Sequence, residues 1–275
     1  MKKTPPLDLK NIKGIVLDID GTLLRGDAPM PGMTIFFDFL TRHDIAFMVA
    51  SNNSTKTTAQ YQQKLSRLGA PIALPQVITS AVGTAAYLRE HYPQGGTAYV
   101  IGKTSLHQAI HEAGFTILQD AAQPVDVVIS GGDDELNYTK LKYAVLLLQK
   151  GARFIGTNPD VVYPTEEGLV PENGTTLAAL QAATGVQPVI VGKPQPYLFN
   201  AAVLKMGTAH AQTAILGDRL ETDILGGRRA GLRTILVATG ADNEQTVPLK
   251  KIYPDLIVQD LNELTRRWQA ALETG

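Results

Sequence analysis

One stretch near the start of the chain constrains the fold more than any other: Gly14-Ile-Val-Leu-Asp18-Ile-Asp20-Gly-Thr22. Its branched apolar run, residues 15–17, is typical of a strand that is buried on both faces. The run ends in two carboxylates, Asp18 and Asp20, and then in Gly21, which favours a turn. Ligand crevices in parallel α/β sheets open at the carboxyl ends of the strands, so we expect chemistry here. Taken alone, the stretch is equally well explained as a plain strand-to-turn junction.

Strand-like apolar runs alternate with helical patterns along the 275 residues, which predicts an α/β fold with a parallel sheet and right-handed crossovers. The outer parts of the chain have predicted strands at residues 15–17, 45–50, 77–78, 189–191, 214–216 and 234–237. The middle part has its own predicted strands at residues 98–101, 115–118, 125–129 and 153–156. We therefore predict a Rossmann-like core formed by residues 1–80 and 187–275, with a separate α/β domain at residues 81–186 inserted into it.

The composition is that of a globular protein, with 44% hydrophobic and 19% charged residues and a formal net charge of -1. This balance provides no field that would attract nucleic acid or an anionic membrane. No apolar run approaches the ~20 residues that span a bilayer, and the initial Met-Lys-Lys-Thr-Pro-Pro lacks the apolar region of a signal peptide. The absence of cysteine excludes disulfides, thiolate metal sites and a cysteine nucleophile. We expect a cytoplasmic protein with no nucleic-acid or membrane partner, and a homodimer remains open.

Polar residues follow four of the predicted outer strands. In chain order they are Asp18 and Asp20, Ser51 and Asn52, Lys193, and Asp218 with Asp223. Ser, Asn and Asp are common helix N-caps, but a lysine cannot cap an N-terminus, and capping is a poor explanation of all four strand ends together. Because the carboxyl ends of parallel strands share one edge of a sheet, we expect these side chains to converge in one crevice.

Electrostatics indicates what this crevice binds. Four converging aspartates repel one another and raise one another's pKa, and Lys193 offsets only one of the charges. A hard divalent cation restores the balance, and Mg²⁺ suits carboxylates, water and a substrate phosphate. A carboxylate nucleophile, a cation, a lysine and a hydroxyl donor are the parts that phosphoryl transfer through an aspartyl-phosphate requires.

The same residues carry a family resemblance. Asp18-Ile-Asp20-Gly-Thr22, Ser51, Lys193 and Gly217-Asp218-Arg-Leu-Glu-Thr-Asp223 resemble, in this order, the four motifs of haloacid dehalogenase (HAD) superfamily phosphatases. The insertion between the second and third motifs resembles the type IIA branch, which holds NagD-like sugar phosphatases and p-nitrophenyl phosphatases. The resemblance implies a Rossmann-like HAD core with an inserted α/β cap domain of the C2-type, in its A subclass.

The resemblance also implies catalytic and metal-binding roles. Asp18 resembles the nucleophile, and Asp20 resembles the general acid that later acts as the base. Asp18, the main-chain carbonyl of Asp20, and Asp218 resemble the Mg²⁺ ligands. Asp223 resembles an outer ligand or a residue that orients the site.

Further residues resemble the substrate-binding and charge-neutralising groups of the family. Lys193 resembles the catalytic lysine that neutralises the nucleophile and the phosphoryl group, and Ser51 belongs with it in the catalytic set. The predicted substrate-binding residues are Gly21, Ser51, Asn52, Asn53, Lys193, Tyr163 and Arg25. Arg25 suits a carboxylate or a second phosphate, unless it points into solvent and pairs with Asp27. Tyr163 can stack on a ring and donate one hydrogen bond, unless it belongs to the core of the cap.

These features together predict a Mg²⁺-dependent phosphatase that hydrolyses small phosphorylated metabolites, such as sugar phosphates, through an aspartyl-phosphate. A phosphotransferase that uses the same intermediate is one alternative, and a dehalogenase-type hydrolase is another. The dehalogenase needs neither a metal nor the acid/base Asp20. A binding protein without activity is disfavoured because no motif residue is lost.

Overall fold

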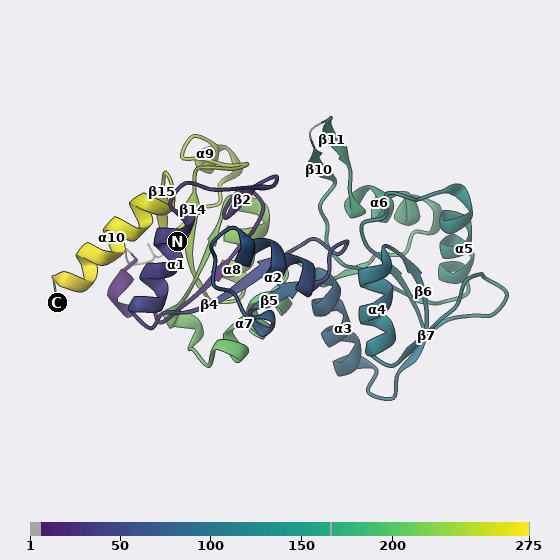
Figure 1. The fold of residues 1–275 in the computed structure, drawn as a ribbon. Helices are drawn as coiled ribbons and strands as arrows, with labels where there is room; N and C mark the ends of the chain where they lie inside the picture. The colour runs from purple at the N-terminus through teal and green to yellow at the C-terminus, as the bar shows by residue number, and fades with distance from the viewer. Residues whose placement is uncertain (1–6, 166, 275) are drawn as a thin grey trace. The chain divides into compact units, whose positions relative to one another are not determined.

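The computed structural model describes residues 7–165 and 167–274, and the chain divides into two compact units (Figure 1). The first unit contains Met1–Ser51, Thr58–Ile78 and Pro194–Gly275, and the second contains Asn52–Thr57 and Thr79–Lys193. The N-terminal hexapeptide considered as a signal sequence lies outside the described residues.

A six-stranded sheet, in the order β15-β14-β13-β1-β4-β5, forms the centre of the first unit. Its strands are β1 (Gly14–Leu17), β4 (Ala46–Ser51), β5 (Val77–Thr79), β13 (Thr213–Gly217), β14 (Arg233–Val237) and β15 (Leu256–Val258). β1 pairs in parallel with both β4 and β13, and β14 pairs in parallel with β13 and β15. The strand order reverses at β1, which is where open α/β sheets bind their ligands.

Helices and tight turns complete the first unit. They are α1 (Met33–Arg42), α2 (Thr58–Arg67), α7 (Tyr197–Met206), α8 (Leu225–Arg229), α9 (Thr246–Lys250) and α10 (Leu261–Glu273), with 3-10 turns at Leu9–Asn11, Leu74–Gln76 and His210–Gln212, a π turn at Leu220–Ile224, and a hairpin of β2 (Leu24–Arg25) and β3 (Ala28–Pro29). α1 and α10 lie side by side (Figure 1), with the ring centroids of Phe39 and Trp268 5.6 Å apart.

The core of the first unit fixes the position of β1. Ile15, Val16 and Leu17 are fully buried, as expected for a strand that is covered on both faces. Their burial anchors the strand in the middle of the sheet, so the residue that follows, Asp18, is presented at the carboxyl edge.

A five-stranded sheet, in the order β12-β9-β8-β6-β7, forms the centre of the second unit. Its strands, which pair in parallel, are β6 (Gly96–Ile101), β7 (Phe115–Ile117), β8 (Val127–Ser130), β9 (Arg153–Gly156) and β12 (Val189–Ile190). The helices are α3 (Ser80–His91), α4 (Thr104–Glu112), α5 (Tyr138–Gln149) and α6 (Asn173–Thr184). A hairpin of β10 (Val162–Thr165) and β11 (Gly168–Pro171) stands out from the rest of this unit (Figure 1).

The prediction that the strand at residues 189–191 belongs to the first sheet is wrong. The structure has β12 at Val189–Ile190, paired in parallel with β9 so that Val189 faces Ile155. α6 ends at Thr184, and the short connection that follows returns the chain beside β9, the strand that precedes this crossover. A short apolar run fits the edge of either sheet, so its pattern alone does not select the partner. Lys193 therefore follows a strand of the second unit.

Among the described residues, no helix combines the length and the apolar character needed to cross a membrane.

Candidate active site

Three buried carboxylates gather at the carboxyl edge of the first sheet. Asp18, Asp218 and Asp223 each offer one oxygen, and these oxygens lie within 4.8 Å of one another. The pairing of β1 with β13 explains why Asp18 and Asp218 lie close together. Leu17 at the end of β1 faces Leu216 of β13, so both aspartates follow neighbouring strand ends. The Asp18 N–H group continues the ladder and donates to the Leu216 carbonyl at 3.0 Å.

Asp218 is held by main-chain groups, and two nearby glycines leave room for its carboxylate. The Ala241 N–H group donates to Asp218 Oδ2 at 2.6 Å, and the Asp242 N–H group donates to the Asp218 carbonyl at 3.0 Å. A β-carbon at Gly21 would lie 2.3 Å from Asp218 Oδ2, and a β-carbon at Gly240 would lie 1.9 Å from it. The carboxylate therefore occupies space that two glycines leave open.

Asp223 is carried by the π turn Leu220–Ile224 and is only 1% exposed. Its Oδ2 accepts a hydrogen bond from the Arg219 N–H group at 3.2 Å and from the Thr222 hydroxyl at 3.4 Å. A β-carbon at Gly217 would lie 2.3 Å from the Asp223 β-carbon, so this position also depends on glycine.

The loop after Asp18 turns sharply at Gly21, whose φ of 90° lies in the left-handed region that favours glycine. The Gly21 N–H group donates to the Leu24 carbonyl at 2.7 Å, and the Thr239 hydroxyl donates to the Gly21 carbonyl at 2.7 Å. Asp20 is half-buried in this loop, and its carboxylate is not part of the group of three found among the described residues. The convergence of Asp20 with the other three aspartates stays a prediction. The predicted metal contact of Asp20 concerns its main-chain carbonyl.

Two other predicted residues of the first unit lie around this edge. Ser51 is the last residue of β4, the neighbour of β1, and it is buried. Arg25 is exposed, and its Nη2 donates to the Thr239 carbonyl at 2.7 Å. Asp27, the alternative partner considered for Arg25, forms an ion pair with Lys64 at 2.7 Å. Arg25 is therefore tied to the loop that also holds Gly21 and Asp218.

In the second unit, the side chain of Asn52 holds the main chain of Lys193. Asn52 Oδ1 accepts the Lys193 N–H group at 2.8 Å, and Nδ2 donates to the Lys193 carbonyl at 2.9 Å. Nδ2 also donates to Asp160 at 2.9 Å. Lys193 is 2% exposed. The structure thus brings together two predicted residues that are 141 positions apart in the chain.

The remaining predicted residues of the second unit lie in a turn and in the hairpin. Asn53 Oδ1 accepts hydrogen bonds from the Thr55 N–H group at 2.7 Å and from the Thr55 hydroxyl at 2.8 Å, which stabilise the turn after Asn52. Tyr163 is half-buried on β10, opposite Val170 of β11.

Comparisons with known proteins identify the family. Residues 15–116 match the haloacid dehalogenase-like hydrolase family, and residues 190–264 match a HAD-hydrolase-like family. The acid sugar phosphatase of Staphylococcus aureus (strain USA300) is 38% identical over 255 residues, which make up 93% of this chain and 97% of that protein. The chain belongs to the haloacid dehalogenase-like hydrolases. Within this family it is a type IIA phosphatase, an enzyme that hydrolyses phosphomonoesters.

Two solved structures extend the likeness to the fold. NagD from E. coli K-12 is 33% identical and matches 92% of this chain and 98% of its own, with a TM-score of 0.83. The glycerol phosphate phosphatase of Mycobacterium tuberculosis, solved in complex with magnesium, is 29% identical and matches 93% of this chain and 77% of its own, with a TM-score of 0.86. The predicted family and the Rossmann-like parallel-sheet core are confirmed.

The donor set of the HAD phosphatase fits a hard divalent cation. Carboxylate oxygens of Asp18, Asp218 and Asp223 are the type of ligand that Mg²⁺ prefers. Three buried like charges this close repel one another, and a bound cation removes that repulsion. The residues present therefore suit a metal at this edge of the sheet.

Sequence reasoning missed the loop that supports the site of the phosphatase. Its residues, Thr239, Ala241 and Asp242, follow β14 in the way that the predicted site residues follow their strands. The rule of polar residues after strand ends, applied to β14, points to Thr239 and Asp242. No local signal distinguishes the main-chain contact of Ala241.

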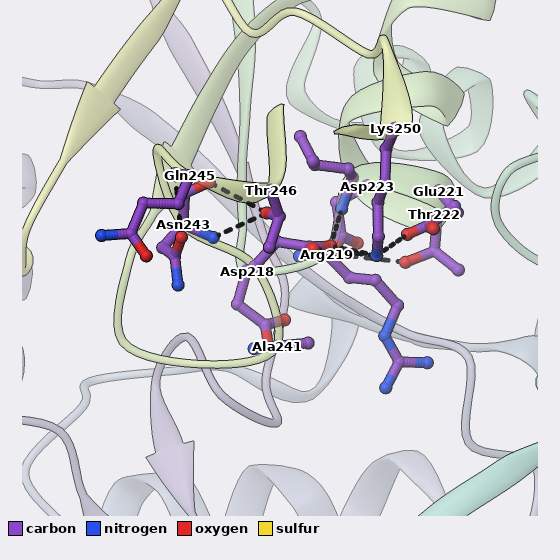
Figure 2. Close-up of polar contacts among 12 residues, drawn as sticks. Asp218, Arg219, Glu221, Thr222, Asp223, Ala241, Asn243, Gln245, Thr246 and Lys250 are labelled. Carbon is purple, nitrogen blue, oxygen red and sulfur yellow. Dashed lines mark hydrogen bonds and ion pairs between the residues drawn. The ribbon is translucent and has the colours of Figure 1, made fainter. Parts of the chain in front are cut away.

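An ion pair lies behind this loop. Asp242 is 1% exposed, and its carboxylate accepts the Leu220 N–H group at 2.8 Å and pairs with Lys250 Nζ at 2.8 Å. Burial acts to raise the pKa of Asp242, but hydrogen bonds from Lys250 and the Leu220 N–H group outweigh it and lower the pKa. Lys250 also pairs with Glu221 at 2.7 Å, and Figure 2 shows these two side chains meeting.

Proposed function

We propose that this HAD phosphatase uses Mg²⁺ to hydrolyse small phosphorylated metabolites, sugar phosphates or similar phosphomonoesters, through an aspartyl-phosphate on Asp18. The observation that supports the proposal best is the group of three buried carboxylates at the reversal point of the sheet, with one oxygen of each within 4.8 Å of the others. The similar S. aureus protein is a sugar phosphatase, and the similar M. tuberculosis protein is a glycerol phosphate phosphatase.

In this proposal the first unit carries out catalysis and the second selects the substrate. The first unit, with its six-stranded sheet, is the catalytic core. The second unit, with its five-stranded sheet and the β10–β11 hairpin, is the C2-type cap that selects the substrate.

The proposed reaction has two steps. In the first, an oxygen of the Asp18 carboxylate bonds to phosphorus, the bond from phosphorus to the ester oxygen breaks, and Asp20 gives its proton to the departing alcohol. In the second, water attacks the aspartyl-phosphate while Asp20 takes a proton from it, which releases phosphate and restores Asp18. Splitting the displacement in this way is the usual benefit of a covalent intermediate.

The surrounding residues bind the phosphoryl group and neutralise negative charge. Ser51 and the main chain at Asn52 bind the phosphoryl oxygens, together with Gly21 and Asn53. The ammonium of Lys193 neutralises negative charge on the nucleophile and on the transferred group, a form of electrostatic stabilisation that costs little reorganisation when the group is preplaced. The hydrogen bonds between the Asn52 side chain and both main-chain groups of Lys193 support such preplacement.

Asp18, the Asp20 carbonyl, Asp218 and Asp223 would hold the magnesium ion. When bound, the ion supplies positive charge that offsets the carboxylates and the substrate phosphate. The ligand oxygens of Asp218 and Asp223 are prearranged by the Ala241 and Arg219 N–H groups.

Metal removal tests the proposal. Enzyme dialysed against EDTA should lose its activity on p-nitrophenyl phosphate, and Mg²⁺ should restore it, with a higher midpoint for Asp218→Ala. Ca²⁺ should bind but support little turnover, because its looser coordination relaxes the in-line geometry. Full activity of the metal-free enzyme would contradict the metal dependence.

A screen of phosphorylated metabolites with added Mg²⁺ then identifies the substrate class. Hydrolysis predicts equal amounts of released alcohol and inorganic phosphate, even when an acceptor such as glycerol is added. A deficit of inorganic phosphate in the presence of the acceptor would instead show a phosphotransferase.

A further inference from the structure

The segment after β14 contacts Asp218 and also the π turn that carries Asp223. The Asp242 N–H group donates to the Asp218 carbonyl at 3.0 Å. The Asp242 carboxylate accepts, at 2.8 Å, the N–H group of Leu220, which begins the π turn that carries Asp223. Asp242, which is buried, therefore bonds both to Asp218 and to the start of the π turn that carries Asp223.

Lys250 closes this arrangement from α9. Its ammonium lies 2.8 Å from Asp242 Oδ1 and 2.7 Å from Glu221 Oε2, and Glu221 belongs to the same π turn as Asp223. Figure 2 shows the Lys250 side chain reaching toward Glu221 near Asp223. The lysine thus links the loop that holds Asp218 to the turn that holds Asp223.

The π turn needs such external support. The π-helical hydrogen-bond pattern is rare and is found mostly as single turns at functional sites. The Leu220 N–H group at its start is buried, and without Asp242 it would lose its acceptor.

We propose that Asp242 and Lys250 are positioning residues that fix the spacing between Asp218 and Asp223, and thereby set the affinity of the site for Mg²⁺. The inference rests on the proposed function in one respect, namely that these carboxylates bind the metal.

Charge alone predicts a different result, and this makes the proposal testable. Removing the positive charge of Lys250 would strengthen Mg²⁺ binding if the lysine acted only through its field, because a like charge would be lost. A positioning role predicts that the same change weakens Mg²⁺ binding, because Asp242 and Glu221 would lose their shared partner.

The experiment is calorimetric titration of Mg²⁺ into metal-free protein, which needs no turnover. Asp242→Asn should weaken binding roughly 10-fold, as is typical for partners behind metal ligands, and Lys250→Met should weaken it by a smaller factor. Lys250→Arg keeps the ion pairs and should retain most of the affinity. Lys251→Met is the matched control, because Lys251 is exposed and next in the chain, and it should not weaken binding.

Thermal melting without metal first establishes that each variant is folded. The Lys250 side chain is 33% exposed, and Lys250→Gln replaces Lys250→Met if the latter fails to fold. Unchanged or tighter Mg²⁺ binding by the folded Lys250 variant would overturn the positioning role while leaving the proposed function intact. If the wild-type protein itself binds no Mg²⁺, the proposed metal dependence and this inference both fail.

Discussion

Gly21 and Asp218 lie so close that a β-carbon at residue 21 would be 2.3 Å from Asp218 Oδ2. Real side chains do not tolerate such a contact, and the Asp218 carboxylate is already fixed by the Ala241 N–H group. The turn after Asp18 and the end of β13, which carries Asp218, are thus fitted to each other, and glycine at residue 21 serves both the backbone conformation and this packing.

Gly21→Ala should therefore displace Asp218 and lower Mg²⁺-dependent activity by roughly 10-fold or more. Gly231→Ala is the matched control, because Gly231 also has a positive φ, 74° against 90°, but a β-carbon there meets nothing within 4 Å. Both variants should lose about 1–2 kcal/mol of stability from left-handed strain. The activities of the two variants are compared at saturating and at limiting Mg²⁺. Equal activity losses in Gly21→Ala and Gly231→Ala would contradict the contact with Asp218.

Asp18→Asn tests the nucleophile. An amide does not attack phosphorus, so turnover should fall by roughly 10³-fold or more, as when other nucleophiles are removed. Stability should be maintained or slightly increased, because one of three clustered carboxylates loses its charge. Phosphate release near the wild-type rate from a clean preparation, checked by intact mass, would refute the covalent mechanism.

Arg25 and Tyr163 are proposed to contact the non-phosphate part of the substrate. Arg25→Ala and Tyr163→Ala should each cost roughly 1–3 kcal/mol in kcat/KM on the best metabolite. For Arg25→Ala the loss on p-nitrophenyl phosphate should be much smaller, since that substrate carries no carboxylate or second phosphate for the guanidinium to bind. An equal loss on both substrates for Arg25→Ala would instead assign the arginine to holding the loop at Thr239, whose carbonyl it contacts at 2.7 Å.

The lowered pKa of Asp126 leads us to expect that the stability of the second unit depends on pH. The Thr97 N–H group and hydroxyl donate to Asp126 Oδ2 at 2.7 and 2.8 Å and lower the pKa of this carboxyl from 3.8. A folded pKa below the unfolded one means that the stabilisation is present above the unfolded pKa and is lost as pH falls through the folded pKa. Asp126→Asn should therefore melt at a lower temperature than wild type at pH 6. The difference should shrink below about pH 4, and a constant difference down to pH 2 would contradict the assignment.

Much of the site was predictable because its signals are local. The apolar run at residues 15–17 specifies a buried strand, Gly21 specifies a turn, and the spacing of Asp218 and Asp223 places both after a second strand. Parallel pairing then brings the ends of β1 and β13 together without further information, because adjacent parallel strands end at the same edge of the sheet. The family resemblance rests on these same short motifs.

Tertiary structure alone decided which distant groups hold these residues. The pairing of β12 with β9, the contact of Ala241 with Asp218 across 23 positions, and the grip of Asn52 on Lys193 across 141 positions leave no periodic or compositional trace. Each depends on where the crossovers return the chain, and the chain returns where distant apolar surfaces pack together. Main-chain N–H and carbonyl groups, which every residue except proline provides in full, make most of these contacts. A sequence specifies which side chains can do the chemistry, whereas packing selects the backbone groups that fix them in place.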